Sequence, residues 1–255
     1  METQSHSLES KNEPVKGPWG QSFRSGILHR CWEGGAVATE SYKRLLAKLL
    51  QPGMELLHAG CGWDKNNVSR PFKDSCDVVG IDPDERVQTM FHSPFFLASL
   101  SSLPFENERF DVVFSEYVME HVSDPATAFG EISRVLKPGG RVVILTPNMF
   151  SYKSLVAALT PQWFHLWMGR IRYGPGHEVD MYPTCFKCNT TRHFKQFAKK
   201  HGFRINRVEY LTNGPTWFSK FPILFEIFHL YHLVIQHCEL FRPLRCALIV
   251  ELEKI

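Results

Sequence analysis

The 255-residue sequence predicts an α/β fold with a seven-stranded, mostly parallel sheet and helices on both of its faces. Short apolar runs, typical of buried strands, alternate with segments of helical periodicity over residues 38–147. This alternation is the pattern of parallel sheets whose crossovers are helices. The hydrophobic share of 44% supports one domain of this kind with insertions, whereas the length is short for two full domains.

The first half of the chain is expected to run helix, four strands, helix, strand. The predicted helix over 125–136 begins with Asp124 as N-cap and Pro125 in its first turn. Residues 137–140 (KPGG) are expected to end this helix before the fifth strand. From the amino-terminal side, the expected segments are 38–50, 54–60, 76–82, 95–99, 109–116, 125–136 and 141–147.

The second half contains two segments without a strand pattern. Residues 148–188 are crowded with aromatic side chains, Met and His and have no clean period, so we interpret them as a lid or insertion. A capped helix over 190–200 and a final strand pair over 204–212 and 246–255 complete the sheet. Residues 213–241 are expected to form a helical insertion between these strands.

The expected helix at 221–241 has an unusually narrow polar stripe. Its polar residues recur at steps of three, three, four and three, namely Glu226, His229, His232, Gln236 and Glu239. The broad apolar face therefore needs a cover, and three interpretations stay open: packing against the sheet or lid, a homodimer seam, or a lipid-facing surface. No stretch reaches about 18 uninterrupted apolar residues, so no membrane span is predicted.

Composition excludes several classes of protein. Lys and Arg number 29 against 26 Asp and Glu without a basic run, which argues against a nucleic-acid binder and favours a small-molecule partner. Residues 1–15 are polar, lack the apolar core of a secretory signal and are predicted to be a disordered tail, leaving 16–255 as one domain. Seven cysteines form an odd set without disulfide-scaffold spacing, which indicates a reducing, cytoplasmic location.

One cysteine pair raises the question of a metal. Cys185 and Cys188 have the spacing of half a zinc site, and His193 is close in sequence. A structural zinc normally takes four ligands, and no second pair of the same kind is present. We therefore predict no metal site.

A glycine turn follows the first predicted strand. In open α/β sheets, ligands bind beyond the carboxyl ends of the strands, where Gly60 and Gly62 are expected to lie. Asp82 ends the second strand twenty residues after Gly62, the spacing at which an acidic side chain reaches the hydroxyls of a ribose. Lys65 replaces the third glycine of a dinucleotide fingerprint, which disfavours a pyrophosphate. The alternative is a tight turn and a strand-end cap without a ligand.

Four motifs give a more specific indication: LLHAGCGWDK, VVGID, LPFENERFDVVFSEYVMEHVSDP and EISRVLKPGGRVVILTPN. In order and spacing, they resemble the class I methyltransferases that use S-adenosylmethionine, especially the type 11 and ubiquinone-pathway group that acts on small molecules. The resemblance covers residues 50–150. It implies a Rossmann-like fold, S-adenosylmethionine as the cofactor and methyl transfer as the activity.

The resemblance also implies a role for individual residues. Gly60 and Gly62 match the turn under the methionine part of the cofactor, and Asp82 matches the ribose ligand. His58 stands where the family usually has an acid, Asp64 replaces a frequent third glycine, and Ser99 replaces the usual adenine-binding Asp. The cofactor contacts expected on this basis are His58, Gly60, Gly62, Asp82, Ser99, Leu100, Ser115 and Glu116.

Methyl transfer to a neutral hydroxyl or amine gains from a general base. His121, Glu116 and His177 are the catalytic candidates, and Glu120 competes for the role, since one helical turn would bring it to the face of Glu116. We expect methylation of an oxygen, with a nitrogen as the second choice. The acceptor is expected to be a small, partly apolar molecule enclosed by residues 148–188 and 211–241. The alternatives are a nicotinamide-dependent oxidoreductase and a catalytically silent, cofactor-binding partner subunit.

Overall fold

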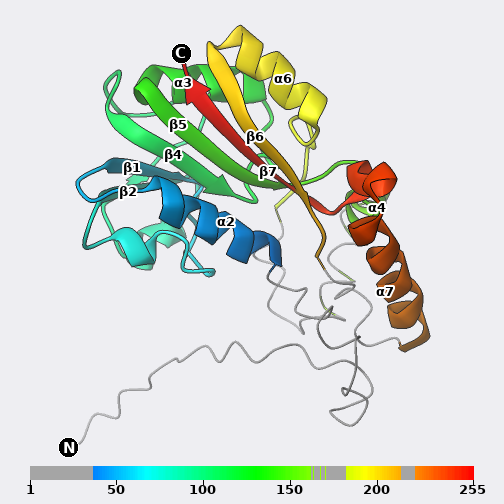
Figure 1. The fold of residues 1–255 in the computed structure, drawn as a ribbon. Helices are drawn as coiled ribbons and strands as arrows, with labels where there is room; N and C mark the ends of the chain where they lie inside the picture. The colour runs from blue at the N-terminus through cyan, green and yellow to red at the C-terminus, as the bar shows by residue number, and fades with distance from the viewer. Residues whose placement is uncertain (1–36, 162, 164–166, 168–169, 171–181, 214–221) are drawn as a thin grey trace, which may run out of the picture.

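A seven-stranded sheet in the order β3-β2-β1-β4-β5-β7-β6 forms the centre of the protein (Figure 1). The computed structural model describes residues 37–161, 163, 167, 170, 182–213 and 222–255. β1 to β5 run parallel, whereas β7 lies antiparallel between β5 and β6. The strands are β1 Glu55–Ala59, β2 Asp77–Asp82, β3 Phe95–Leu97, β4 Phe110–Glu116, β5 Leu136–Pro147, β6 Phe203–Leu211 and β7 Ala247–Lys254.

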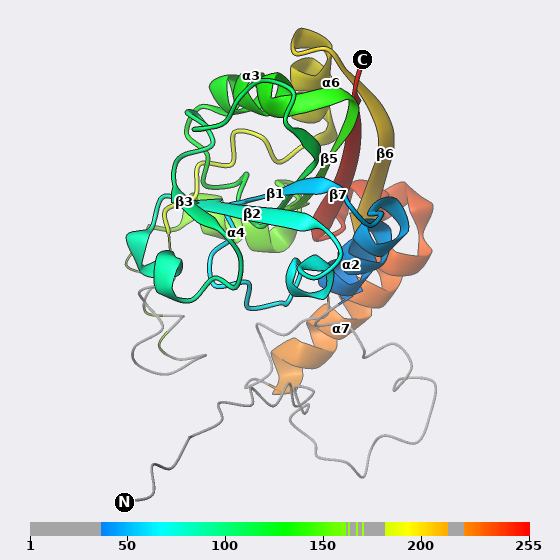
Figure 2. The same cartoon turned by 90° about the vertical axis from the view of Figure 1, so that its left-hand side faces the viewer.

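Helices cover both faces of this sheet, as Figure 2 shows. α2 (Val37–Leu49) packs on one face, and α3 (Pro125–Val135) and α6 (Thr191–Lys200) pack on the other. α4 (Tyr152–Leu159) and α7 (Pro222–His237) lie beyond the end of the sheet, and the ring of Tyr152 packs 4.7 Å from that of Phe228. No helix in the described ranges has the length and apolar character needed to cross a bilayer.

Strand alternation explains why the core is divided into two clusters. Successive side chains of a strand point to opposite faces, so Leu57 and Ala59 join the cluster under α3 and α6 while Leu56 joins the cluster under α2. Burying an aliphatic side chain of this kind stabilises the fold by about 1.5–3 kcal/mol. On the α2 side, the buried Tyr42 hydroxyl donates to the carbonyl oxygen of Ser115 at 2.9 Å, which fixes the helix against β4.

The predicted fold class is confirmed, with the seven strands and both helical layers in place. Asp124 caps α3 by accepting from the backbone N–H of Thr127, as the sequence predicts. The interpretation of KPGG as the end of a helix was incomplete. β5 begins at Leu136, and residues 137–140 form a bulge in which Gly139 has a φ of +75°. A bulge inserts residues opposite a continuous partner strand, and its left-handed residue favours glycine.

Other expected boundaries also change. β3 ends at Leu97, and the long helix ends at His237, after which residues 239–244 form a 3₁₀ helix that includes Pro243. α4 supplies a regular element inside the expected lid, where none was predicted. The polar stripe of α7 faces partly inward, because His229 and His232 are buried. The expected tail, residues 1–15, lies outside the described residues.

Candidate functional site

The carboxyl ends of β1 and β4 adjoin the point where the strand order reverses, which is the usual ligand position in open α/β sheets. Gly60 follows β1 with a φ of +68°, and a Cβ atom there would lie 2.4 Å from Cγ2 of Val118. Gly62 has a φ of +47°. Both positions are left-handed, and at Gly60 a side chain would also clash. The chain needs glycine there to make a turn this close to the end of β4.

The Asp82 carboxylate is joined to this glycine turn. Its Oδ2 accepts the backbone N–H of Gly62 at 3.0 Å, and its Oδ1 accepts the backbone N–H of Asp84 at 3.0 Å. Burial raises the pKa of Asp82, while these two hydrogen bonds act in the opposite direction. Each oxygen keeps a further lone pair. The carboxylate is therefore held in one orientation and can still accept hydrogen bonds from two neighbouring hydroxyls.

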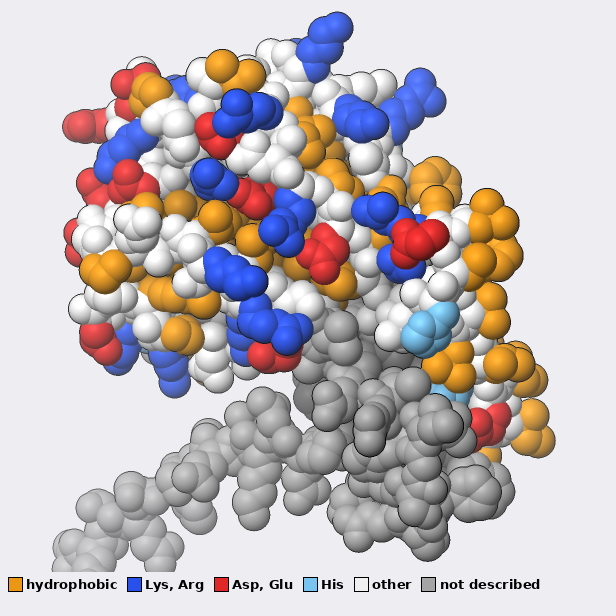
Figure 3. Space-filling view, in the orientation of Figure 1, with side chains coloured by type: hydrophobic (Ala, Val, Ile, Leu, Met, Phe, Trp, Pro, Cys, Tyr) orange, Lys and Arg blue, Asp and Glu red, His pale blue; other side chains and the backbone are white. Residues whose placement is uncertain are grey.

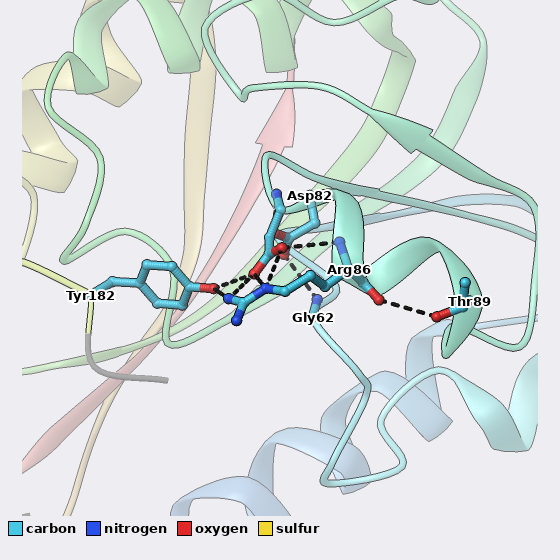
Figure 4. A network of polar contacts seen from close by, with 6 residues as sticks. Gly62, Asp82, Arg86, Thr89 and Tyr182 are labelled. Carbon is cyan, nitrogen blue, oxygen red and sulfur yellow. Dashed lines mark hydrogen bonds and ion pairs between the residues drawn. The ribbon is translucent and has the colours of Figure 1, made fainter. Parts of the chain in front are cut away.

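A polar network extends from the loop after β2 to a distant segment (Figure 4). Arg86 Nε donates to Asp84 Oδ1 at 2.8 Å, and the Tyr182 hydroxyl donates to Asp84 Oδ2 at 2.7 Å. These bonds lower the pKa of Asp84 well below its usual range. The sequence did not indicate Asp84, Arg86 or Tyr182 as site residues. Only Asp84 has a local signal, because it lies two residues after Asp82. The network connects residues 182–188, the described end of the expected lid, to the edge of the site.

Asp64 accounts for one departure from the glycine pattern. It adopts a φ of +46°, and its carboxylate accepts the backbone N–H groups of Val68 at 2.6 Å and Arg70 at 3.2 Å. The Ser69 hydroxyl also donates to it, at 3.0 Å. Asp is among the few non-glycine residues that tolerate this conformation, because its side chain bonds to nearby backbone. Asp64 therefore organises the loop that follows the turn.

His58 has a core position. Its ring stacks 4.6 Å from that of Phe114, packs edge-on 6.0 Å from that of Phe91, and is 2% exposed. Burial lowers its pKa, so the ring is neutral. The geometry gives the expected cofactor contact of this side chain no support.

Glu116, at the end of β4, is held by two side chains. The Thr39 hydroxyl donates to Oε1 at 2.6 Å, and the Asn66 amide donates to Oε2 at 3.0 Å. Burial raises the pKa of Glu116. The carboxylate thus connects α2, β4 and the loop after the glycine turn.

The chain after β4 is a turn, so the expectation that Glu116 and Glu120 share a helical face was wrong. Tyr117 has a φ of +55°, and its N–H donates to the carbonyl oxygen of Leu145 at 2.8 Å. The N–H of His121 then donates to the carbonyl oxygen of Val118 at 2.9 Å. A left-handed residue cannot continue a right-handed helix, so Glu116 and Glu120 do not lie one helical turn apart.

That turn pairs Glu120 with His121. The His121 Nδ1 atom lies 2.8 Å from the carbonyl oxygen of Pro183 and donates to it, which leaves Nε2 as the acceptor nitrogen. This Nε2 lies 4.0 Å from Oε1 of Glu120. The Glu120 carboxyl is buried, accepts the Thr146 hydroxyl at 3.2 Å, and has a pKa raised to about 8 by its burial. A buried carboxyl with a raised pKa and an imidazole therefore lie side by side.

The family model described as a methyltransferase domain matches residues 57–144. This range begins in β1, includes the glycine turn, Asp82 and the Glu120–His121 pair, and ends in β5. Over these residues the chain is similar to the class I S-adenosylmethionine-dependent methyltransferases.

Named relatives differ in what they methylate. Ubiquinone biosynthesis O-methyltransferase of Cereibacter sphaeroides is 31% identical over 142 residues, 52% of this chain and 57% of that protein. Cycloartenol-C-24-methyltransferase 1 of Oryza sativa subsp. japonica is 32% identical over 142 residues, 48% of this chain and 39% of that protein. The chain thus spans less than two thirds of the length of either relative.

Solved structures support the fold. Geranyl diphosphate C-methyltransferase of Streptomyces coelicolor, solved with Mg²⁺, geranyl diphosphate and S-adenosyl-L-homocysteine, matches with a TM-score of 0.57 and 16% identity. The match covers 85% of this chain and 78% of that chain. This likeness concerns the arrangement of strands and helices and does not extend to the substrate.

The remaining candidate residues differ in accessibility. Ser99 is exposed and its hydroxyl accepts the N–H of Ser101 at 3.2 Å, whereas Leu100 is buried. Ser115 is buried, with its carbonyl oxygen bonded to Tyr42. His177 lies outside the described residues. In the described ranges, no group of three or more His, Cys, Asp or Glu side chains could hold a metal.

Proposed function

We propose that this protein transfers the methyl group of S-adenosylmethionine to an oxygen, or as the second choice a nitrogen, of a small and partly apolar acceptor. The observation that carries the proposal is the Asp82 carboxylate, fixed by the N–H of Gly62 beside a turn that only glycine can make. An oriented carboxylate suits the two ribose hydroxyls, and the side-chain-free turn leaves room for the aminoacyl part of the cofactor. No phosphate-binding third glycine is needed for such a ligand.

When bound, S-adenosylmethionine would supply the methyl group, with the neutral thioether as the leaving group of a displacement by the acceptor oxygen or nitrogen. The protein mainly has to align the acceptor with that carbon and exclude water. We assign the described end of the lid, residues 182–188, and residues 211–213 to the walls of the acceptor site. Tyr182 and Pro183 are tied there to Asp84 and His121 through the bonds described above.

A hydroxyl or amine acceptor must also lose a proton. We assign this proton to Nε2 of His121, because its Nδ1–H is already committed to Pro183. The resulting imidazolium lies beside the buried Glu120 carboxyl, 4.0 Å from its Oε1. Glu116 is the weaker candidate for the base, since the hydrogen bonds from Thr39 and Asn66 favour its ionised form and so oppose the uptake of a proton.

The class of acceptor rests on chemistry and on the relatives. The two curated relatives are named for ubiquinone and cycloartenol, which supports an acceptor with an apolar part.

The cysteines in the described ranges are free, which agrees with the proposed cytoplasmic location. We propose no nucleic-acid partner, because positive and negative charges nearly balance.

Transfer of a deuterated methyl group tests the function, because the label marks any acceptor that the protein methylates. The purified protein is incubated with S-adenosylmethionine carrying a CD₃ group and with a small-molecule extract, and the mixture is analysed by mass spectrometry. We expect one extract component to gain the label, with S-adenosylhomocysteine formed in equal amount. Binding of the cofactor without any labelled product would favour the silent partner subunit, and preferential binding of a nicotinamide nucleotide would favour the oxidoreductase.

A further inference from the structure

Glu120 is a buried carboxyl, and its Oε1 has no hydrogen-bond partner among the described residues. Lys, Arg, Asp and Glu side chains lie across the molecular face in Figure 3, whereas Glu120 is 4% exposed. Glu251 is buried to the same degree but pairs with Arg141. In the part of the chain that the structure describes, no Lys or Arg pairs with Glu120. A buried polar atom without a partner is costly, so Oε1 points to a ligand.

The hydrogen bonds around Glu120 determine which of its oxygens carries a proton. The buried Asn189 donates its two Nδ2 hydrogens to the Pro147 carbonyl oxygen at 3.1 Å and to Thr146 Oγ1 at 2.6 Å. A carbonyl oxygen only accepts, which fixes the orientation of this amide. The Thr146 hydroxyl therefore donates its own hydrogen to Oε2 of Glu120, at 3.2 Å. Oε2 is thus the acceptor oxygen, and the proton of a neutral Glu120 lies on Oε1.

His121 lies across a gap from this oxygen. Its Nε2, the acceptor nitrogen, is 4.0 Å from Oε1, which is too far for a direct hydrogen bond. One oxygen atom can lie about 2.8 Å from both, with about 90° between the two directions. Such an oxygen accepts from Oε1–H and donates its own hydrogen to Nε2, so the gap fits a hydroxyl group. Val118 of the same turn packs against Gly60, beside the proposed cofactor site.

We propose that Glu120 is a specificity-determining residue, which donates a hydrogen bond from Oε1 to the oxygen of an acceptor hydroxyl whose own hydrogen goes to Nε2 of His121. The acceptor oxygen forms its bond to the methyl carbon with a lone pair, and the electron pair of the broken carbon–sulfur bond stays on sulfur. The hydroxyl proton passes to Nε2, and Glu120 keeps its proton.

The number of lone pairs on the acceptor atom gives the selectivity. A hydroxyl oxygen has two, one for the Glu120 hydrogen bond and one for the methyl carbon. A neutral amine has a single lone pair, which cannot serve both, so its transfer would leave the buried Glu120 donor without a partner. The site therefore selects a hydroxyl over an amine. This inference rests on the proposed methyl transfer and narrows its substrate class.

Burial keeps the donor protonated at neutral pH. It raises the pKa of Glu120 to about 8, with a smaller contribution in the same direction from Glu116, while the Thr146 hydroxyl and the residue's own backbone N–H act in the opposite direction. Tyr117 and His121 are the other titratable groups of this turn. The segment that packs against the Glu120 carbonyl oxygen adds Cys185, Lys187 and Cys188. Hydroxyl binding should therefore weaken as the pH rises through 8.

Binding of phenol tests the donor role without methyl transfer. The full-length protein is titrated with phenol, or with toluene as the matching ring without a hydroxyl. The readout is the ¹⁵N chemical shift of His121 Nε2, assigned by its loss in His121→Gln. We expect phenol to shift this signal at pH 7 and to bind about tenfold more weakly at pH 9, where about nine tenths of Glu120 is ionised. Toluene should leave the signal unchanged at both pH values.

Four variants separate Glu120 from other titrating groups. Glu120→Gln cannot ionise, and Thr146 holds its carbonyl oxygen so that the amide replaces Oε1–H, so phenol should bind it equally at both pH values. Glu106→Gln, at an exposed position, is the control and should keep the tenfold loss. Thr146→Val removes a donor that favours the ionised form, so Glu120 should keep its proton to a pH about one unit higher and the loss should shrink to about twofold. Thr146→Ser should restore the tenfold loss.

Three results would overturn the proposal: no shift of His121 Nε2 by phenol, a phenol affinity that is equal at pH 7 and pH 9, or an equal loss in folded Glu120→Gln. Melting temperatures report folding, and the comparison of pH values in the unsubstituted protein does not depend on a variant. A CD₃ label on a nitrogen of the acceptor would contradict the hydroxyl selection while supporting methyl transfer. If no label is transferred at all, the proposed function fails, and the phenol titrations still decide whether Glu120 is the donor.

Discussion

Replacement of Glu120 by Gln should change how the stability of the protein depends on pH. The folded-state pKa of Glu120 is raised from 4.5 to about 8 by burial, so the folded chain holds this proton more tightly than the unfolded chain does. The contribution to stability is fully present below pH 4.5 and is lost as the pH rises through 8. At 1.36 kcal/mol per pK unit, the loss between pH 5 and pH 8 is about 3 to 4 kcal/mol.

Urea unfolding at pH 5 and pH 8 measures this quantity. Gln cannot ionise, so the difference in unfolding free energy between the unsubstituted protein and Glu120→Gln isolates residue 120 from all other titrating groups. We expect this difference to shift by about 3 to 4 kcal/mol in favour of the variant at the higher pH. Glu106→Gln, at an exposed position, is the control and should give equal differences at both pH values. A constant difference for Glu120→Gln would refute the argument that this carboxyl is buried and protonated near neutral pH.

Two further substitutions test the turn and the proposed base. Gly60→Ala should destabilise the fold by about 2 to 4 kcal/mol, from its left-handed φ and the 2.4 Å contact with Val118. The control is Gly139→Ala, with a φ of +75° and open space around it, which should lower the stability by only about 1 kcal/mol. Thermal unfolding compares the two variants. Equal losses of stability would show that the clash with Val118 contributes nothing. Once an acceptor is known, His121→Ala should lower turnover by roughly a hundredfold or more and leave S-adenosylhomocysteine affinity within a few-fold. Near-normal turnover would remove His121 from the mechanism.

The strands and helices around the site could be predicted because their signals are local. Apolar runs and caps predict β1, β2, β4 and α3 nearly to the residue. The KPGG segment was harder, because a glycine with positive φ is equally typical of a helix end and of a β-bulge. Only the pairing of Leu136 with Phe110 distinguishes them, and that contact is made by residues distant in sequence.

The site was predictable where spacing along the chain determines the geometry. Asp82 and Gly62 are joined as their twenty-residue separation suggests, whereas the bond from Tyr182 to Asp84 spans 98 residues and leaves no local signal. The left-handed Tyr117 likewise follows from packing at the end of β4 and is not encoded by a glycine. The core position of His58, however, could have been deduced, since it lies two residues after Leu56 and therefore on the same face of β1.

The central claim is that the glycine turn and Asp82 bind the nucleoside cofactor, and calorimetric titration with S-adenosylhomocysteine tests it most directly. We predict a micromolar Kd for the unsubstituted protein, weakened in Asp82→Ala by about 1 to 3 kcal/mol, which is roughly 5- to 150-fold. Asp77→Ala, at the exposed start of the same strand, should keep the original affinity. No binding by the unsubstituted protein, or equal affinity in Asp82→Ala, would contradict the account.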